Sequence, residues 1–591
     1  MSGQSEGSAP LTLAQPARTA IAARLNERTM PPGMVPIALY FALMLLAPLG
    51  LLIAYSFWKA SFFAVTPTFT LQNYQRVLTS SLYSQILLKT LGCSFIVACV
   101  AVVIGYAISY AISFRFKIWG PRLLVLIMAS LLSSYIVRLY ALTTILGTNG
   151  LLNQTLLGIG LIDQPLGFLL YGYFAIVIAL VYVYLPFAVL PMYAGLQGIA
   201  RHLLEASRDL GSGPVQTFLR VTLPLSMRGI RTAFALCFIL AAADYVVPRL
   251  VGGMNGQMIG AIIADQFGGA SNYPLGAALS VSMVIGFAVV LGAAFGVERL
   301  ATRLWRAKPR HASGSGRRQG GIDWPNIPLS ETITLLALVF LFAPLLTVVF
   351  FSFNAARNPG LPFTGFTLHW YGDVVQSPDF LRVLGTSLTV CVSAVAGGLL
   401  IGLPGALALA RSRFALKGFF ALLVYGPMAV PGVVIGVALL ATFVFTGIRL
   451  GVLGTAAAHI LLVTPFIVIV IRTRLEKMDR RIEEAARDLG SSPARVFRTV
   501  TLPILAPSLL GAGILAAAIS LDELLVTNFT IGSQATVPVW ISSQMRIGLS
   551  PSLNAVAVLM LSGSLGLIAL AAIAIRLRRT MRLSSALAEA A

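Results

Sequence analysis

Charged residues are scarce in this chain, and their scarcity excludes a water-soluble protein. Only 10% of the 591 residues are charged, whereas 57% are hydrophobic and the mean hydropathy is +0.88. This composition is typical of a chain embedded in a lipid bilayer. The formal net charge of +22 suggests nucleic acid at first sight. Nucleic-acid binding, however, needs basic residues gathered on a soluble face, and here they lie between apolar runs, so no nucleic-acid partner is expected.

Cysteine and histidine are also rare, which argues against a disulfide framework or a metal centre. The four cysteines all fall within apolar runs and are expected to be small buried hydrophobes: Cys93, Cys99, Cys237 and Cys391. The four histidines form neither an H-E-x-x-H motif nor a close cluster: His202, His311, His369 and His459. We therefore expect no metal site.

A phosphate-binding loop is missing from the sequence. No G-x-x-x-x-G-K-[ST] segment occurs, and ATP hydrolysis of the P-loop type needs one to hold the nucleotide phosphates. A membrane-embedded enzyme would need a convergent nucleophile and base, and none is recognisable. The sequence thus predicts a protein that is not an enzyme and binds no cofactor directly.

Twelve apolar stretches are long enough, at roughly 20 residues each, to cross a bilayer as helices. Those predicted in the first half are 35–57, 85–114, 121–146, 171–196, 230–251 and 273–297. Those predicted in the second half are 333–353, 383–410, 418–445, 454–471, 504–530 and 553–575. The expected fold is an all-α polytopic membrane protein with two six-helix repeats.

Basic residues orient these spans, because short cytoplasmic loops hold the excess of Lys and Arg. Such residues precede the first span and follow the second, fourth, sixth and twelfth spans, which places all of these segments on one side. Both termini are therefore expected in the cytoplasm, and both repeats have the same orientation. The expected location is a bacterial inner membrane.

The repeat also divides the chain into segments. "FTLQNY" at Phe69 returns as "FTLHWY" at Phe366, 297 positions later, whereas Pro186 and Pro465 lie 279 apart. The first half therefore contains about 18 extra residues, expected in the loop 147–170. We predict a disordered cytoplasmic tail (1–30), a first domain (31–307), a flexible cytoplasmic linker (308–328) and a second domain (329–591).

One polar segment occurs twice. "EASRDLGSGPVQTFLRVTLP" from Glu205 and "EAARDLGSSPARVFRTVTLP" from Glu484 agree at 13 of 20 positions. Each lies between the fourth and fifth spans of its half, on the side predicted to be cytoplasmic. We expect a short helix that ends at Gly211 or Gly490 in a left-handed conformation, followed by a second helix that begins near a proline.

These loops resemble the cytoplasmic signature of binding-protein-dependent ABC importer permeases, Glu-Ala-Ala, three residues, Gly, nine residues, then Ile/Val-x-Leu-Pro. The matching residues are Glu205, Ala206, Gly211, Val221, Leu223 and Pro224 in the first copy, and Glu484, Ala485, Ala486, Gly490, Val500, Leu502 and Pro503 in the second. Ser207 stands where the family has its second alanine. The resemblance implies a type I importer permease fold in which each loop docks one ABC ATPase subunit.

Further segments resemble the two permease subunits of spermidine/putrescine importers, joined in one chain. "GTNGLLNQTLLGIGLID" from Gly147 is similar to one subunit, and "LDELLVTNFTIG" from Leu521 to the other. The expected function is therefore translocation of a polyamine delivered by a solute-binding protein, driven by two separate ATPase subunits expected to form a homodimer. Alternatives are a permease for iron(III) or another small solute, because fused permeases also occur among iron(III) importers, and an ion-coupled secondary carrier.

Three acids lie within predicted spans, where ionisable groups are costly and mark functional positions by default. Asp244 and Glu523 are equivalent at the repeat offset of 279, and Asp522 adjoins the latter. Together with Tyr245 they are candidates to line a path for a cationic solute. The alternative is that each acid pairs with Arg249, Arg138 or a span-end amide and supports assembly only.

Overall fold

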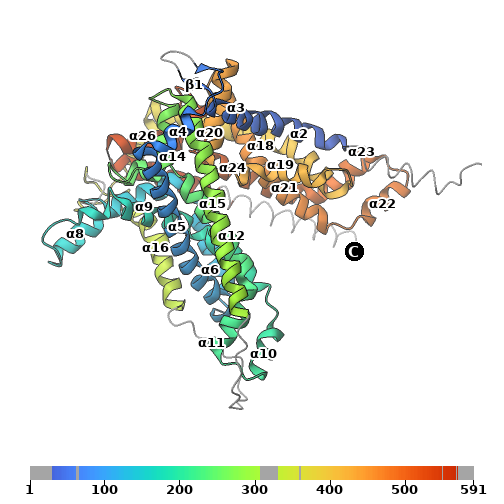
Figure 1. Ribbon diagram of the computed structural model, residues 1–591, viewed down its shortest axis with the longest axis horizontal. Coiled ribbons are helices and arrows are strands. Elements are labelled where there is room, and N and C mark those ends of the chain that lie inside the picture. The colour runs from blue at the N-terminus through green and yellow to red at the C-terminus, as the bar shows by residue number, and fades with distance from the viewer. Residues whose placement is uncertain are drawn as a thin grey trace, which may run out of the picture. The chain divides into compact units, whose positions relative to one another are not determined.

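Helices form nearly all of the structure, a computed structural model that describes residues 30–60, 65–116, 118–306, 330–357, 361–548, 550–566 and 569 (Figure 1). The prediction of an all-α chain is confirmed in these residues, where the only sheet pairs β1 (Lys59–Ala60) with β2 (Val65–Thr66) in antiparallel register. The predicted linker, 308–328, and the predicted tail apart from Met30 lie outside the described residues.

The first half of the chain contains elements from η1 to α15, where η marks a short 3-10 or π turn. After the sheet strands already given, the elements are η1 (Pro32–Met34), α2 (Val35–Phe41), η2 (Ala42–Leu46), α3 (Ala47–Ser56), α4 (Gln72–Thr79), α5 (Ser81–Tyr110), η3 (Ala111–Arg115), α6 (Gly120–Ala129), η4 (Ser130–Leu132), α7 (Tyr135–Leu146), α8 (Leu151–Gly158), η5 (Gly167–Leu169), α9 (Tyr173–Gln197), α10 (Arg201–Asp209), α11 (Pro214–Thr217), η6 (Phe218–Thr222), α12 (Leu223–Ala243), α13 (Val246–Val251), α14 (Ile259–Phe267) and α15 (Tyr273–Arg306).

The second half repeats much of this order. Its elements are α16 (Ser330–Phe351), α17 (His369–Gln376), α18 (Pro378–Arg411), α19 (Lys417–Tyr425), η7 (Gly426–Met428), α20 (Gly432–Thr446), α21 (Val452–Lys477), α22 (Arg481–Asp488), α23 (Pro493–Val496), η8 (Phe497–Thr501), α24 (Leu502–Asp522), α25 (Thr527–Thr530) and α26 (Val537–Ile547). A further apolar helix is Pro551–Gly566. The extra residues of the first half lie where predicted, because α8 and η5 occupy the connection from α7 to α9.

Nine helices within the described residues are long and apolar enough to cross a membrane. A tenth is obtained if Lys417–Met428 and Gly432–Thr446 form one span. The predicted number of twelve is therefore not confirmed, although helices occupy every predicted stretch. The third stretch is divided into shorter helices, and the helix described in the twelfth is Pro551–Gly566.

The third and ninth predicted spans are both interrupted, and at equivalent places. Helices α6 and α19 begin 297 positions apart, and so do α7 and α20, which follow the interruptions. Ser133 and Ser134 have extended backbone conformations before α7, and Pro431 has ψ 136° before α20. An extended residue cannot continue the helical hydrogen-bond pattern, so the prediction of continuous helices was wrong here.

The fifth and eleventh helices end earlier than predicted. The predicted ends were 251 and 530, but α12 ends at Ala243 and α24 at Asp522. The short helices α13 and α25 follow, starting at Val246 and Thr527. The apolar run continues through these breaks, so hydropathy alone does not reveal them.

Two compact units, each built from segments distant in sequence, make up the chain. Unit 1 contains 1–46, 392–429 and 460–517, and unit 2 contains 47–391, 430–459 and 518–591. In unit 2, α5, α9 and α12 pack closely: a Cβ on Gly229 of α12 would lie 2.5 Å from the carbonyl oxygen of Pro191 in α9. Small residues permit such close approach between membrane helices.

The long helices keep large apolar side chains on their outer surfaces. Val103 of α5, Leu336 of α16 and Leu400 of α18 are 69%, 62% and 76% exposed within the chain. Exposed apolar side chains on many successive turns are unfavourable in water and stable in lipid. This surface agrees with the membrane location that the composition predicts.

Candidate functional site

The two copies of the polar repeat fold into the same local structure. In the first, α10 ends before Gly211, whose φ is +81°, and α11 begins at Pro214. In the second, α22 ends before Gly490, with φ +82°, and α23 begins at Pro493. The left-handed conformation that the sequence predicts is confirmed at both glycines, and it is a conformation that glycine adopts without strain.

Backbone hydrogen bonds close the two glycine corners in the same way. The amide of Gly211 donates to the carbonyl of Arg208 at 2.8 Å, and that of Ser212 donates to Ser207 at 3.1 Å. In the second copy the amide of Gly490 donates to Arg487 at 2.8 Å, and that of Ser491 to Ala486 at 3.1 Å. The two segments, which are identical at 13 of 20 positions, therefore form turns with the same backbone hydrogen bonds.

The helices before each corner present their motif residues to the outside. Glu205 and Ala206 are exposed in the first copy, and Glu484 and Ala485 in the second. The leucines just before the corners, Leu210 and Leu489, are 80% and 87% exposed. A large apolar side chain held in the open beside a carboxylate suits a protein partner better than a connection between spans.

The ends of the two motifs lead directly into long helices. Leu223 and Pro224 begin α12, while Leu502 and Pro503 begin α24. A π turn precedes each helix, η6 in the first copy and η8 in the second. Figure 1 shows α10 and α11 at one end of the helices of unit 2, and the chain continues from them through η6 into α12.

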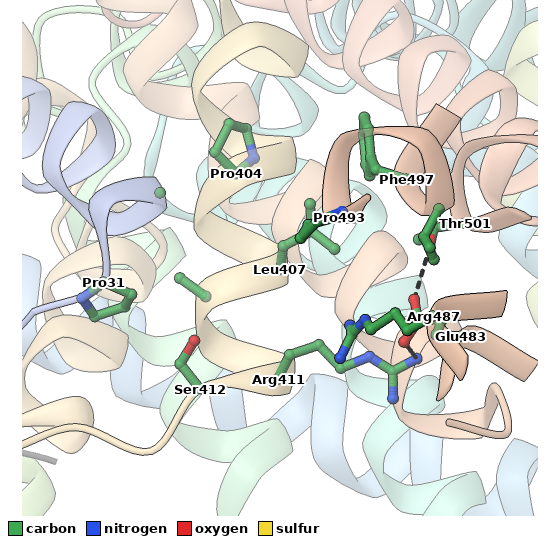
Figure 2. Close-up of a pocket in the computed structure, with 13 residues that line it drawn as sticks. Pro31, Pro404, Leu407, Arg411, Ser412, Glu483, Arg487, Pro493, Phe497 and Thr501 are labelled. Atoms are coloured by element: carbon green, nitrogen blue, oxygen red, sulfur yellow. Dashed lines mark hydrogen bonds and ion pairs between the residues drawn. The ribbon is translucent and has the colours of Figure 1, made fainter. Parts of the chain in front are cut away.

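Different side chains hold the two loops. In the first copy the hydroxyls of Ser207 and Thr217 lie 3.2 Å apart and share a hydrogen bond. In the second, Glu483 accepts a 2.7 Å hydrogen bond from Thr501 and forms an ion pair with Arg411 (Figure 2). The sequence alone does not identify Glu483 or Arg411 as partners, because they lie 72 positions apart and no motif contains both.

Asp244, one of the three predicted membrane acids, is fully buried and surrounded by donors. The hydroxyl of Tyr135 donates to its two oxygens at 2.9 and 2.7 Å, and that of Tyr184 donates at 2.8 Å. The amides of Val246 and Val247 donate at 2.9 and 3.0 Å, so Asp244 also holds the start of α13. These contacts fit the assembly role that the sequence left open, with tyrosines in place of the expected arginines.

The other two acids are partly exposed within the chain. One oxygen of Asp522 accepts a 2.6 Å hydrogen bond from the amide of Tyr135, so Tyr135 contacts acids from both halves. Glu523 accepts a 2.7 Å hydrogen bond from the amide of Val526, three residues on, as Asp244 does from Val247. Asp244 and Glu523, which are equivalent in sequence, therefore each accept a hydrogen bond from the backbone amide three residues later.

Tyr245 and the candidate arginines each have several partners. Arg138 interacts electrostatically with Asp522, as the alternative assembly role allows, and Arg249 lies 5.7 Å from the centroid of the Tyr245 ring. The hydroxyl of Tyr245, a buried residue, donates to the carbonyl of Leu525 at 3.2 Å. Arg249 forms an ion pair with Asp265, and Arg138 donates to the carbonyl of Val183 at 3.1 Å. The structure thus brings Tyr245 to the turn that follows Glu523, in unit 2.

The remaining titratable side chains of the described residues do not meet the requirements of a metal centre. Among the described residues no group of three His, Cys, Asp or Glu side chains could hold a metal ion. His459 is buried between the hydroxyls of Ser520 and Thr527, at 2.8 and 2.7 Å. This histidine is a hydrogen-bonded core residue, as a lone histidine usually is.

Known permease proteins are similar to parts of this chain. The putrescine transport system permease protein PotI of Escherichia coli (strain K12) is 34% identical over 249 residues, 41% of this chain and 88% of PotI. The spermidine/putrescine transport system permease protein PotB of the same strain is 35% identical over 239 residues, 40% of this chain and 86% of PotB. Each relative thus corresponds to less than half of this chain.

A solved structure and a family description complete the comparison. A bacterial ABC transporter involved in the import of the acidic polysaccharide alginate aligns with 42% of this chain and 94% of its own, at 16% identity and a TM-score of 0.34. The description "binding-protein-dependent transport system inner membrane component" matches residues 34–304 and again 398–580. The chain therefore belongs to the family of binding-protein-dependent transport system inner membrane components, and it is a multi-pass transport subunit, not an enzyme, with two copies of the family domain.

Proposed function

We propose that this chain is the membrane-spanning permease of an ABC importer for polyamines, made from two permeases fused in one polypeptide. The observation that carries the proposal is the pair of glycine-cornered loops with the same backbone hydrogen bonds. One exposed loop per permease domain offers one docking surface to each subunit of an ATPase dimer. An ion-coupled secondary carrier would have no use for two such matched loops.

Each loop docks through its exposed helix. Residues Glu205 and Ala206 meet one ATPase subunit, and Glu484 with Ala485 meets the other, while the glycines fix the angle of the helix. Closure of the ATPase dimer around ATP then moves both loops and, through Leu223 and Leu502, the long helices α12 and α24. A homodimer suits the arrangement, because the two loops share their turn geometry. ATP is bound and hydrolysed by these partners.

The proposed domains are a first permease domain at 31–307 and a second at 329–591, joined by a linker at 308–328 and preceded by a tail at 1–30. Both termini and both loops are on the cytoplasmic side of the inner membrane, because the excess of Lys and Arg lies in those segments. A solute-binding protein delivers the solute from the opposite side.

A polyamine is favoured as the solute by two relatives whose names state putrescine or spermidine transport. A path for a cation with several ammonium groups needs carboxylates and aromatic faces. Asp522 and Glu523, two residues of intermediate exposure, supply carboxylates, and Tyr245 contacts the turn after Glu523. Asp244 acts at the same place by holding Tyr135 and Tyr184, since donors already surround its carboxylate.

The experiment is uptake into proteoliposomes that contain the chain, its ATPase and its solute-binding protein. ATP should drive accumulation of labelled putrescine or spermidine, and uptake should vanish without the binding protein. ATP-driven uptake of iron(III) with neither polyamine accepted would contradict the polyamine assignment. Uptake driven by an ion gradient without ATPase would contradict the importer itself.

A further inference from the structure

The two loops differ at one buried position of their first helix. Leu204 of α10 and Glu483 of α22 are equivalent at the repeat offset of 279, and they are 4% and 8% exposed. Leu204 belongs to the apolar core of unit 2. Burying a leucine is favourable, whereas burying a carboxylate requires partners that compensate for lost hydration.

The partners of Glu483 come from two other elements of unit 1. One carboxylate oxygen accepts the 2.7 Å hydrogen bond from the Thr501 hydroxyl in η8. The other lies 3.2 Å from a guanidinium nitrogen of Arg411, the last residue of α18. The Glu483 and Arg411 side chains are only 11% and 19% exposed, so solvent weakens this pair much less than a surface pair. The loop is thereby tied to the end of α18 and the start of α24.

The first loop is held to the corresponding helix by aromatic packing. Phe218 of η6 contacts the rings of Tyr106 and Tyr110 edge to face, with centroid distances of 6.0 and 5.9 Å. Tyr106 also shares a 3.0 Å hydrogen bond with Ser226 of α12. This contact connects the loop to the end of α5, as the charged contact connects the second loop to the end of α18.

The second copy retains one of these three aromatic residues and has leucine in place of both tyrosines, with Leu403 equivalent to Tyr106 at the offset of 297. Phe497 is equivalent to Phe218 at the offset of 279, and Leu407 is equivalent to Tyr110 at the offset of 297 that relates α5 to α18. A cavity of about 330 Å³ lies here, lined by Leu407 and Phe497 together with Arg411, Glu483 and Thr501 (Figure 2). Leu407 is smaller than the tyrosine at the equivalent position of the first copy, where the Tyr110 ring contacts Phe218.

We propose that Arg411, Glu483 and Thr501 form a clasp that positions the second docking loop on the end of α18, replacing the aromatic contact that positions the first. The inference rests on the proposed function, since the loop is taken to receive the ATPase. The clasp residues position the loop and do not contact the solute. Without the clasp, movement of the ATPase would shift α22 relative to α18. Only part of that movement would then be transmitted to the membrane-spanning helices.

The first test measures the position of the loop without any transport. Spin labels are placed at Leu489→Cys and Leu416→Cys, both exposed in unit 1, in the chain with its four native cysteines replaced. The wild-type distance distribution should be narrow, and Glu483→Gln or Arg411→Met should broaden it. The control is Glu476→Gln, which removes a partner of Arg472 in the last turns of α21 and leaves Arg411, Glu483 and Thr501 in place.

The second test measures transport against hydrolysis in proteoliposomes with the partner ATPase and binding protein. Glu483→Gln and Arg411→Met should lower solute uptake per ATP hydrolysed by about tenfold, within the range known for residues that transmit coupling. Inserted protein and hydrolysis should change little. The rescue variant Leu407→Tyr/Arg411→Phe/Glu483→Leu grafts three first-copy residues, Tyr110, Phe114 and Leu204, at the equivalent positions. It should restore both the narrow distance distribution and most of the coupling.

Unchanged distances and unchanged uptake per ATP in both single variants would overturn the clasp. So would a proportional loss of uptake, hydrolysis and inserted protein, because such a loss indicates folding alone. A rescue variant that inserts normally but keeps the broad distribution would also contradict the proposal. Failure of the wild type to take up any solute with ATP would count against the proposed function, while the distance measurement would still decide the clasp.

Discussion

The hydroxyl of Tyr135 donates hydrogen bonds to both carboxylate oxygens of Asp244, at 2.9 and 2.7 Å. Tyr135 is the first residue of α7, where the third predicted span is interrupted. Its amide also donates to Asp522, at 2.6 Å. The interruption thus places one residue between acids that come from the two halves of the chain.

Tyr135→Phe should destabilise the protein, because it leaves a fully buried carboxylate with fewer donors. Hydrogen bonds to charged groups contribute about 2 kcal/mol each, so the unfolding temperature in detergent should fall by several degrees. Tyr173→Phe is the matched control, because the Tyr173 hydroxyl donates to an exposed carbonyl, that of Gln257. An equal unfolding temperature for both variants would show that the Tyr135 contact contributes little.

Glu523→Gln and Asp244→Asn should have different effects, although the two acids are equivalent in sequence. The glutamine keeps an oxygen for the Val526 amide but loses the charge that would attract a cation. We expect the solute concentration for half-maximal uptake to rise about threefold or more, with normal insertion. Asp244→Asn should instead reduce stability, because an amide accepts fewer of the surrounding hydrogen bonds.

The measurement is uptake against solute concentration, with inserted protein quantified for each variant. Glu298→Gln is the control, because Glu298 pairs with Arg231 away from these acids. Unchanged uptake kinetics in Glu523→Gln would remove Glu523 from the proposed path.

The orientation of the chain in the membrane can be tested at the linker, which is predicted to lie on the cytoplasmic side. A single cysteine at Ser313 should react with a membrane-impermeant reagent only from the cytoplasmic side, because the basic segments lie there. The comparison is between intact spheroplasts and inverted vesicles, with the native cysteines replaced. Labelling in intact spheroplasts would reverse the proposed orientation of both loops.

Local sequence predicted local structure well. A glycine after a short amphipathic helix and a proline three residues later sufficed to predict the corners at Gly211 and Gly490, because turn conformation depends on a few adjacent residues. Hydropathy likewise placed a helix in every predicted span. It missed the interruptions before Tyr135 and Gly432, because Ser and Pro are both tolerated inside membrane helices and leave the apolar run unbroken.

Contacts between distant residues could not be predicted in the same way. Glu483 stands beside the motif residue Glu484, yet its burial depends on Arg411, which ends a helix 72 positions earlier. The two copies of the repeat differ at one informative position, because Leu204 of the first loop is equivalent to Glu483 of the second. A charge that replaces a leucine at a buried position implies a partner, but only the fold identifies it.

The most direct test of the account concerns the glycine corners. Gly211→Val and Gly490→Val place a β-branched residue at φ +81° and +82°, which costs about 1–2 kcal/mol and favours another path for the loop. No atom lies within 4 Å of a Cβ at either glycine, so the change acts on the turn and not on packing. Gly213→Val is the matched control, in the same loop, equally open, with φ −67°.

The measurement is ATP-driven polyamine uptake in proteoliposomes with the partner ATPase and binding protein, normalised to inserted protein. The account predicts that either corner variant alone lowers uptake about tenfold, as expected for a strain of this size, while Gly213→Val stays near wild type. Near-normal uptake from both corner variants would contradict the docking of an ATPase on these loops.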